Sequence, residues 1–330
     1  SKTIYLKSSY QGLCHIFSFM LLLCLFYLGV TWSVDAFQDH ENVLRTETNT
    51  KRAKALLSAL CDAYNRKEVS GEACLRLCLY RNWTVSHFSQ GSKVVIAIEE
   101  NGRSVILKSL HANIEDYDAP PKGVTYEQFL RKIHGKTENQ TKLGWPTNLN
   151  HHLLSILWPN HKRLRSNPLS SADRRSLWAL VHQPEYLTFR ILPISRLTPK
   201  VIGSCGHMYE VESLVPFRLS NDWIRIKGKI VNHLMGTLKL FNEFLNEPLQ
   251  WCDIRYENLG LSGEYPDRFV VMDGHRLFTE SKFRSLTYNK TCKTDDDCAI
   301  GDCTSRCEAN FKCGSRINDN VEVNLNSRLN

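Results

Sequence analysis

Two aspartates and one asparagine in the last third of the chain have the spacing that phosphoryl transfer requires. Asp253 is followed by Asn258, and Asp273 comes after a turn and an apolar run. Such a transfer needs a carboxylate that accepts the proton of a hydroxyl group. It also needs an amide oxygen and a second carboxylate that hold Mg²⁺ against the phosphates of a nucleotide. The spacing therefore predicts Asp253 as the base, with Asn258 and Asp273 as metal ligands.

The neighbours of these residues only partly follow the pattern of a protein-kinase catalytic loop and its metal-binding acid. Trp251 and Cys252 stand where His and Arg usually precede the catalytic Asp. Gly274 and His275 follow the second acid where that pattern has Phe and then Gly. The alternative is a β-hairpin with acids at its ends, because Asp, Asn and Gly are common turn residues. The flanking segments favour the kinase interpretation.

An apolar, strand-like region upstream supplies a lysine for the same chemistry. We expect three strands, over residues 83–88, 93–100 and 103–108. Asn101-Gly102 between two apolar runs is a strong hairpin signal. Lys108 ends the third strand as the lysine of V-A-I-K does, so its ammonium group would bind nucleotide phosphates. Gly91 is the glycine available to the loop that covers those phosphates. An exposed lysine at a strand end is the alternative interpretation.

A helix further along carries the acid that such a lysine requires. Residues 172–192 have the pattern of a helix that Pro184 kinks or divides. Glu185 on this segment is the predicted ion-pair partner of the strand lysine, and Glu127 is the alternative. We favour Glu185, because the residues that follow it, 198–214, have the pattern of two more strands and a hinge.

These elements come in the order that a two-lobed, protein-kinase-like α+β fold requires. The predicted parts are a small β-rich amino-terminal lobe at 83–212, an insertion at 111–167 with helices near 126–134 and 149–157, and a shortened helical carboxyl-terminal lobe at 213–290. A long helix over 222–246 leads into the Asp253 loop. Its apolar positions recur with helical spacing and form the predicted core face: Ile230, Leu234, Leu238, Phe241 and Leu245.

The amino-terminal region contains an apolar stretch long enough to cross a membrane. Residues 13–34 carry no formal charge, Lys2 and Lys7 precede them, and three acids follow. By the positive-inside rule, residues 1–12 stay cytosolic, and the chain beyond the single-pass anchor is luminal. A cleaved signal peptide is the alternative. The polar residues 35–54 would form a stem between the membrane and the folded body.

The cysteine pattern agrees with an oxidising compartment. Ten of the twelve cysteines lie beyond the apolar stretch, and their even number predicts disulfide bonds: Cys61, Cys74, Cys78, Cys205, Cys252, Cys292, Cys298, Cys303, Cys307 and Cys313. They mark a helical cap at 55–82 and a cysteine-rich segment with a polar tail at 291–330. The alternative, a zinc site in the latter, lacks paired C-x-x-C motifs and His. Three N-x-T triplets are glycosylation candidates, at Asn82, Asn139 and Asn289.

The charge balance bears on the class of partner. The chain of 330 residues has 42 Lys and Arg against 34 Asp and Glu, a net charge of +8. Because no basic block with interleaved aromatic residues stands out, we expect a solvated basic surface and no nucleic-acid partner. Acidic or phosphorylated ligands are compatible with this charge.

The sequence resembles the divergent protein kinase domain family 1, the cysteine-rich type II membrane proteins of the endoplasmic reticulum. The resemblance covers nearly the whole chain. Besides the anchor, it rests on CDAYNRKEVSGEACLRLC, SLWAL, PKVIGSCGHMYEVES, WCDIRYENLGL, VVMDGHRLF and CKTDDDCAIGDCTSRCEANFKC. It implies a kinase-like fold that faces the lumen. We therefore expect an endoplasmic reticulum membrane protein, with the Golgi as the alternative, and Mg-ATP as the cofactor if the protein is active.

Two departures from the family alter what the resemblance implies. Relatives carry an EF-hand-like calcium loop before the helix that contains Trp178. Residues 162–173 here have Lys, Leu and Ser where acids should stand, which argues against calcium binding. Relatives also continue with a helical region after the last cysteines, whereas this sequence has a polar tail, so we expect a shortened carboxyl-terminal lobe.

Two hypotheses of different classes stay open. The first is a luminal kinase for a protein or glycan, in which Asp253 is the base and Glu185 orients Lys108 on the phosphates. The second is a pseudokinase that binds partners without turnover. The missing glycine-rich loop and Cys252 favour the second hypothesis, and the intact set of two acids and one amide favours the first.

Overall fold

The computed structural model describes residues 46–159, 169–192, 197–216, 223–243, 245–261 and 269–317. The chain divides into two compact units, residues 1–53 and 54–330. In the first unit, residues 46–53 are helical, and the predicted anchor at 13–34 lies outside the described residues. None of the helices in the described ranges combines the length and the apolar character needed to cross a membrane.

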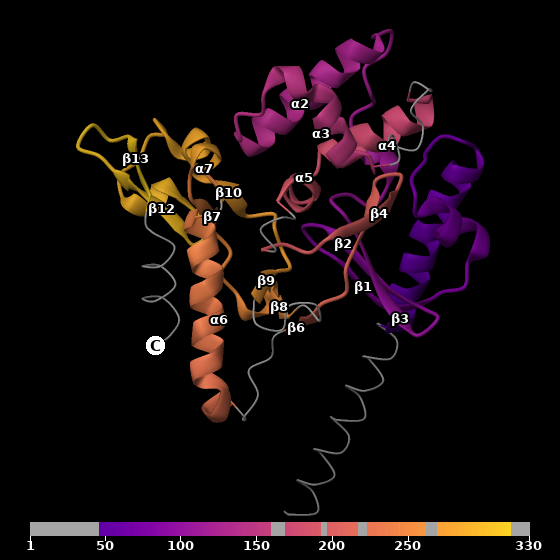
Figure 1. The fold of residues 1–330 in the computed structure, drawn as a ribbon, viewed down its shortest axis with the longest axis horizontal. Helices are drawn as coiled ribbons and strands as arrows, with labels where there is room; N and C mark the ends of the chain where they lie inside the picture. Colours follow the sequence, from indigo (N-terminus) through magenta and orange to yellow (C-terminus); the bar gives the residue numbers. More distant parts are fainter. Residues whose placement is uncertain are drawn as a thin grey trace, which may run out of the picture. The chain divides into compact units, whose positions relative to one another are not determined.

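A five-stranded antiparallel sheet organises the first half of the second unit (Figure 1). Its strands are β1 (Thr84–Gln90), β2 (Val94–Glu100), β3 (Arg103–Ser109), β4 (Val201–Cys205) and β5 (Met208–Val211), in the order β1-β2-β3-β5-β4. Asn101 and Gly102 join β2 to β3 with φ angles of 51° and 74°, the left-handed conformation that a tight hairpin turn requires. The predicted hairpin and the two later strands are confirmed.

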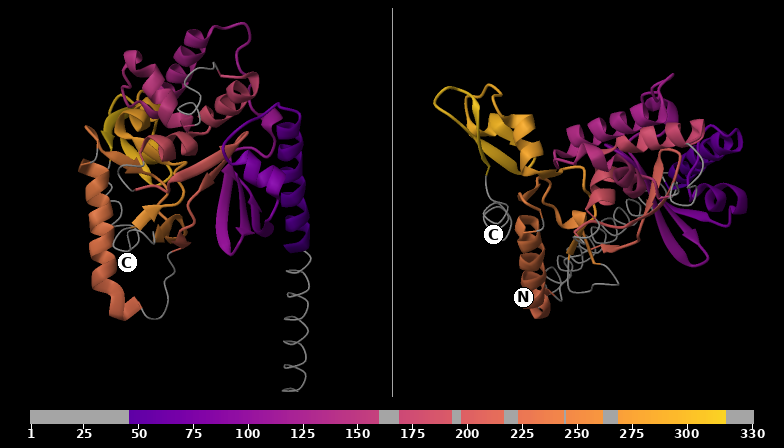
Figure 2. Two further views of the ribbon diagram at one scale, coloured as in Figure 1. Left: turned by 45° about the vertical axis from the view of Figure 1, so that its right-hand side comes forward. Right: turned by 45° about the horizontal axis from the view of Figure 1, so that its top comes forward.

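Four helices pack beside this sheet and share an apolar core with it (Figure 2). They are α2 (Tyr126–Thr141), α3 (Asn150–Leu157), α4 (Ser171–Val181) and α5 (Pro184–Ile191), with the short turns η2 (Ile114–Asp116) and η3 (Thr147–Leu149) before α2 and α3. The core brings together Phe129 of α2, Leu154 of α3, Leu177 of α4 and Tyr209 of β5. The two helices predicted near 126–134 and 149–157 are both present.

The break between α4 and α5 places an acid at the start of a new helix. Ser170 begins α4 through a capping box with Asp173, in which each side chain accepts a hydrogen bond from the other's backbone N–H. Gln183 is extended, and Pro184 is the first residue of α5, where its missing N–H costs no helical hydrogen bond. Pro184 therefore divides the helix, as predicted. Of residues 162–173, where relatives carry a calcium loop and the sequence argues against one, residues 162–168 lie outside the described residues.

Two disulfide bonds hold the cap at the start of the second unit. Residues 54–65 are helical and are followed by the short π-helix η1 (Leu75–Tyr80). The Cys61–Cys78 bond joins these two segments, and the Cys74–Cys205 bond joins the cap to β4, an edge strand of the sheet. Helical segments and disulfide bonds are therefore present where the cap was predicted.

The described part of the second half contains one long helix and three small sheets. The helices are α6 (Trp223–Glu243) and α7 (Glu280–Thr287), with the turns η6 (Tyr256–Asn258) and η7 (Asp295–Cys298). The sheets are β6 (Val215–Pro216) with β8 (Leu259–Leu261) and β9 (Phe269–Val271), β7 (Leu249–Trp251) with β10 (Leu277–Thr279), and β11 (Ala299–Ile300) with β12 (Cys303–Cys307) and β13 (Cys313–Ile317). The described part of this half has more strand than the predicted helical lobe, because most of its strands have only two or three residues, too few to show a period in the sequence.

The predicted core face of α6 is largely present. Leu238 and Phe241 are buried, Leu234 and Leu245 are half-buried, and all four belong to one cluster with Trp251 of β7 and its neighbours. The side chain of Ile230 lies outside the described residues. This cluster supports β7, the strand from which the chain enters the Asp253 loop.

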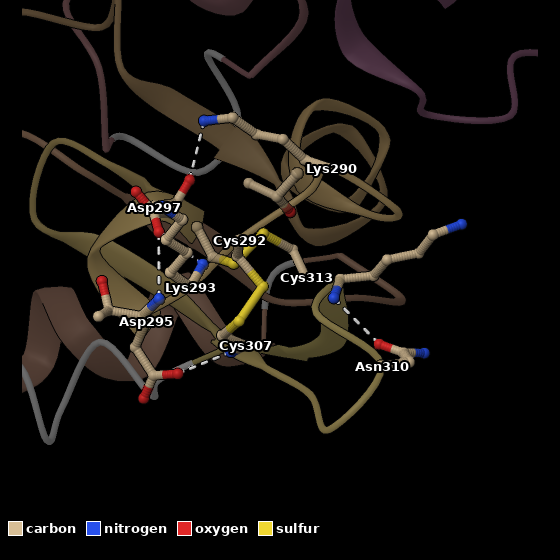
Figure 3. The surroundings of a disulfide bond; sticks show 12 residues. Lys290, Cys292, Lys293, Asp295, Asp297, Cys307, Asn310 and Cys313 are labelled. Carbon is tan, nitrogen blue, oxygen red and sulfur yellow. Dashed lines mark hydrogen bonds between the residues drawn. A yellow bond between two sulfur atoms is a disulfide. The ribbon is translucent and has the colours of Figure 1, made fainter.

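The cysteine-rich segment is a small hairpin held by two further disulfide bonds, Cys292–Cys307 and Cys298–Cys313 (Figure 3). Its acids satisfy backbone groups: Oδ2 of Asp297 accepts from the N–H of Lys293 at 2.7 Å, and Oδ1 of Asp295 accepts from the N–H of Cys307 at 2.6 Å. With Cys252–Cys303, all ten cysteines are paired, which confirms the predicted disulfide bonds. Their sulfur atoms are bonded to one another and are not free thiolates for zinc.

Candidate active site

Lys108 and Glu185 form a buried ion pair across the sheet and α5. Strand β3 places Lys108 opposite Tyr209 of β5, and its Nζ lies 2.6 Å from Oε1 of Glu185. The two side chains are 8% and 6% exposed. Glu127, the alternative partner, is exposed on α2 and lies 3.4 Å from Nε2 of His151. The structure therefore pairs the lysine with the glutamate that the sequence favoured.

The local sequence of α5 explains how this acid is held. Glu185 is in the first turn, where a carboxylate is favoured by the helix dipole. The residues that follow it, Tyr186, Leu187 and Phe189, are buried in the core, which fixes the rotation of the helix. Nζ of Lys108 also lies 5.2 Å from the centroid of the Phe189 ring, a cation–π distance.

Asp253 and Asn258 lie together on the loop after β7. Nδ2 of Asn258 donates to Oδ2 of Asp253 at 2.8 Å and to its carbonyl oxygen at 3.2 Å. Because the amide nitrogen makes both contacts, the amide oxygen of Asn258 is the atom that can bind a cation. Oδ1 of Asp253 lies 3.0 Å from Nε of Arg255, whose side chain is exposed.

Asp273 follows β9 and is brought to the same loop by the backbone. The N–H of Met272 donates to the carbonyl oxygen of Asn258 at 2.8 Å, and the carbonyl oxygen of Met272 accepts from Nζ of Lys108 at 2.6 Å. Asp273 is therefore held between the strand lysine and the Asp253 loop. Its Oδ2 lies 2.7 Å from Nζ of Lys93, and its Oδ1 lies 2.5 Å from Nδ1 of His275.

Gly274 is required by the close approach of Phe189. A Cβ atom at this position would lie 2.6 Å from Cε1 of the Phe189 ring, closer than side-chain atoms pack. Gly274 thus allows the segment after β9, with Asp273, to pack closely against α5.

Three side chains at this point have the arrangement of a cation site. One ligand atom each from Asp253, Asp273 and His275 lie within 4.8 Å of one another. Mg²⁺ prefers oxygen ligands, so the carboxylates of Asp253 and Asp273 suit it and the imidazole of His275 does not. Asn258, which is hydrogen-bonded to Asp253, has an amide oxygen of the same preferred type. The oxygen donors of this cluster therefore fit Mg²⁺.

The charges of the site shift the pKa values of its members. Burial lowers the pKa of Lys108, although Glu185 opposes this. Burial also lowers the pKa of Lys93, but the carboxylates of Glu185 and Asp273 outweigh it and the pKa is raised. Burial raises the pKa of Asp273, yet the hydrogen bond from His275 and the charge of Lys93 bring it well below its usual value. Asp273 is therefore ionised at neutral pH, as a metal ligand must be.

Comparison with known families agrees with this geometry. Residues 177–325 match the family model described as the protein-kinase domain of FAM69. This part of the chain is a FAM69-type, divergent kinase-like domain. A domain of this kind is a kinase or a pseudokinase.

The matched residues of the FAM69-type domain hold most of the candidate site. Glu185, Asp253, Asn258 and Asp273 lie within the match. Lys108 precedes it, on strands that the structure joins to the domain by β-pairing and by the ion pair. The roles assigned to these residues from the sequence, and that of Gly91 in the loop between β1 and β2, stay predictions.

In the FAM69-type domain, a disulfide bond and two hydrogen bonds hold the backbone on both sides of Asp253. Cys252 is bonded to Cys303, and its carbonyl oxygen accepts from the N–H of Asp302 at 3.0 Å. Oδ2 of Asp302 accepts from the N–H of Ile254 at 2.6 Å. The cysteine-rich segment therefore fixes the loop where a His-Arg pair would usually precede the base.

Sequence reasoning missed three residues of the site: Lys93, His275 and Asp302. The sequence places Lys93 directly after the Gly91 turn and before an apolar strand, a position that faces a phosphate-binding loop. It gives no comparable signal for Asp302, because only the fold brings the Cys303 hairpin to the Asp253 loop.

The three glycosylation candidates have exposed side chains. Asn82 lies just before β1, Asn139 lies in the last turn of α2, and Asn289 follows α7. Exposure is what an acceptor asparagine requires, so the modification stays a prediction at each position.

Proposed function

We propose that this chain is a Mg-ATP-dependent kinase of the secretory pathway that transfers the terminal phosphate of ATP to a hydroxyl group of a luminal protein or glycan. The observation that supports this function best is the convergence of the Lys108–Glu185 pair with the Asp253–Asn258 pair and Asp273. Phosphoryl transfer is catalysed almost entirely by positioning and charge, and these side chains can supply both in a mixed α/β protein with a kinase-like domain.

Each side chain has a defined task in this reaction. Asp253 accepts the proton of the substrate hydroxyl group. The hydroxyl oxygen then bonds to the γ-phosphorus of ATP, and the bond between this phosphorus and the bridging oxygen breaks, so that ADP leaves. Lys108, oriented by Glu185, binds the phosphates through its charge. Asp273 and the amide oxygen of Asn258 would hold Mg²⁺, which when bound neutralises charge on the transferring phosphate.

The cellular setting is part of the proposal. Five disulfide bonds are typical of proteins that fold in an oxidising compartment. Together with the apolar stretch at 13–34, they support a single-pass type II membrane protein of the endoplasmic reticulum whose kinase-like part faces the lumen. The substrates are then proteins or glycans of that lumen.

One specific observation favours the second candidate function, a pseudokinase. In this structure, Asp273 is paired with Lys93 and His275, and Gly91 is the one glycine of the loop between β1 and β2. A protein whose metal-binding acid stays paired with these two side chains would act by binding partners.

Transfer of labelled phosphate separates the two functions. The full chain is incubated with Mg²⁺, γ-labelled ATP and proteins of the secretory pathway, next to an Asp253→Asn variant and an Asp118→Asn control, whose carboxylate is exposed. We expect label transfer by the wild type and the control, and a loss of at least about a hundredfold in the Asp253→Asn variant. Glycosidase digestion then tells a protein acceptor from a glycan acceptor.

Either of two outcomes would overturn the kinase assignment. Equal transfer by the Asp253→Asn variant would remove this residue from the role of base. Binding of Mg-ATP by the wild type without any transfer would identify a pseudokinase.

A further inference from the structure

Lys93 is a second lysine in the candidate site, and it bridges the two acids that the reaction needs. Its Nζ lies 2.6 Å from Oε2 of Glu185 and 2.7 Å from Oδ2 of Asp273. The side chain comes from the turn between β1 and β2, directly before β2, and is 15% exposed. The cation of this turn thus contacts an oxygen that the predicted metal would take.

The carboxylate of Asp273 cannot neutralise both the ammonium group of Lys93 and a Mg²⁺ ion bound beside it. The ammonium of Lys93 and a bound Mg²⁺ would repel each other strongly at this separation in a partly buried site. Metal binding at Asp273 therefore requires Lys93 to leave this carboxylate.

Glu185 does not need Lys93 to stay neutralised, because Oε1 of Glu185 keeps its contact with Nζ of Lys108. Departure of Lys93 therefore leaves no buried acid without a partner once a metal occupies Asp273. Once released, Lys93 places its positive charge on the turn between β1 and β2, which would cover the nucleotide.

That turn is poor in glycine, so it has few of the closely approaching backbone N–H groups that bind phosphates in glycine-rich loops. A lysine side chain is a flexible point charge that binds phosphate without such a backbone. The ammonium group of Lys93 can therefore bind the phosphates that backbone N–H groups bind in proteins with a glycine-rich loop.

We propose, on the basis of the proposed Mg-ATP site, that Lys93 is an exchangeable cation. In the nucleotide-free protein it holds Asp273 in place of the metal, and when Mg-ATP binds it moves to the nucleotide phosphates. Lys93 is thus a nucleotide-binding residue that lowers the affinity of the protein for the free metal ion and raises its affinity for the metal–nucleotide complex.

The test compares two affinities in the full chain. Mn²⁺ binding without nucleotide is measured by electron paramagnetic resonance, and Mg-ATP binding is measured by titration calorimetry. We expect a Lys93→Met variant to bind Mn²⁺ about tenfold more tightly and Mg-ATP about tenfold more weakly than the wild type. A Lys93→Arg variant, which keeps the charge, should stay close to the wild type in both. A Lys122→Met variant, which changes an exposed lysine that is not part of the candidate site, is the matched control.

The opposite signs make the result decisive. A Lys93→Met variant that binds both ligands more weakly would show that Lys93 only supports the structure of the site, and a variant that binds both like the wild type would show that it has no part in binding. Either result overturns the inference while the wild type still binds Mg-ATP. Failure of the wild type to bind Mg-ATP would instead overturn the proposed function, and this inference with it.

Discussion

Cys252 is bonded to Cys303 through a disulfide that lies one residue before Asp253. Cys303 begins β12 of the cysteine-rich hairpin, so one covalent bond joins that hairpin to the loop of the proposed base. Asp302 adds hydrogen bonds on both sides of Asp253. The hairpin therefore positions the loop.

We predict that removal of this bond affects turnover as well as stability. A Cys252→Ala/Cys303→Ala variant should lose about 4 kcal/mol of unfolding free energy, because the bond closes a segment with a sequence separation of 51. It should also lose phosphate transfer, since Asp253 is no longer held. Thermal unfolding and label transfer are measured on the same preparation.

The matched control removes the Cys292–Cys307 bond, which has a sequence separation of 15 and does not adjoin Asp253. This variant should lose about 3 kcal/mol and keep its transfer rate at temperatures where it is folded. Equal loss of transfer in both variants would argue against a positioning role for Cys303.

Breaking the Lys108–Glu185 pair should be costly. A Glu185→Gln variant leaves two lysines without their shared carboxylate, and removal of one partner of a buried pair costs about 3–5 kcal/mol. Mg-ATP binding should fall with it. A Glu127→Gln variant, on the exposed face of α2, should change stability by less than about 0.5 kcal/mol. If Glu127→Gln were the more damaging change in unfolding and calorimetric binding, the assignment of the pair would be wrong.

The Lys108–Glu185 pair also shows what the sequence could predict. Order along the chain was sufficient to pair a strand lysine with the right one of two glutamates, because the strands after α5 must return to the same sheet. Asp253, Asn258 and Asp273 were predictable for a similar reason, since their separation is fixed by a short loop and a hairpin. These residues lie close in sequence or on consecutive elements.

Contacts between distant segments were not predictable from the sequence. Lys93 was placed in a strand by its apolar neighbours, and nothing in its local pattern showed that its side chain would reach Asp273. Asp302 meets Ile254 only because the Cys252–Cys303 bond joins their segments, and disulfide pairing does not follow from spacing. The described part of the carboxyl-terminal half has more strand than periodicity indicated, because strands of two or three residues have no repeat to detect.

The close contact at Gly274 gives a steric prediction. A Gly274→Ala variant should lose about 1–3 kcal/mol and bind Mg-ATP poorly, because the new Cβ would push Asp273 away from α5. A second change, Phe189→Leu, should restore part of the binding by making room. In contrast, Gly135→Ala in α2 meets nothing within 4 Å and should stabilise the protein by about 0.5–1 kcal/mol. Calorimetry and thermal unfolding check all three, and a Gly274→Ala variant that binds like the wild type would contradict the packing described.

His207 predicts a loss of stability in mild acid. Burial lowers the pKa of His207 to about 4, and its Nε2 lies 3.0 Å from the carbonyl oxygen of Ala112. The charged and titratable groups that act on it are Glu115, Asp116 and His111. As the pH falls below about 6.5, the unfolded chain binds a proton at this residue before the folded protein does, so stability decreases.

The loss from His207 should reach about 2 kcal/mol at pH 5. Thermal unfolding of the wild type between pH 7 and pH 5 is compared with that of a His207→Gln variant, whose amide can still donate to Ala112. The variant should lose less stability over this range, whereas a His87→Gln control on the exposed face of β1 should behave like the wild type. Parallel curves for the wild type and the His207→Gln variant would contradict the buried neutral histidine.

The central claim is that Asp273, beside Asp253 and the lysine–glutamate pair, forms a site for Mg²⁺ and ATP together. Thermal unfolding of the full chain with Mg²⁺, with ATP, and with both tests it most directly, next to an Asp273→Asn variant. We predict that only the combination stabilises the wild type, by about 3 kcal/mol at a hundred times the dissociation constant, and that the variant loses this effect. An equal shift in the Asp273→Asn variant, or no shift in the wild type, would contradict the claim.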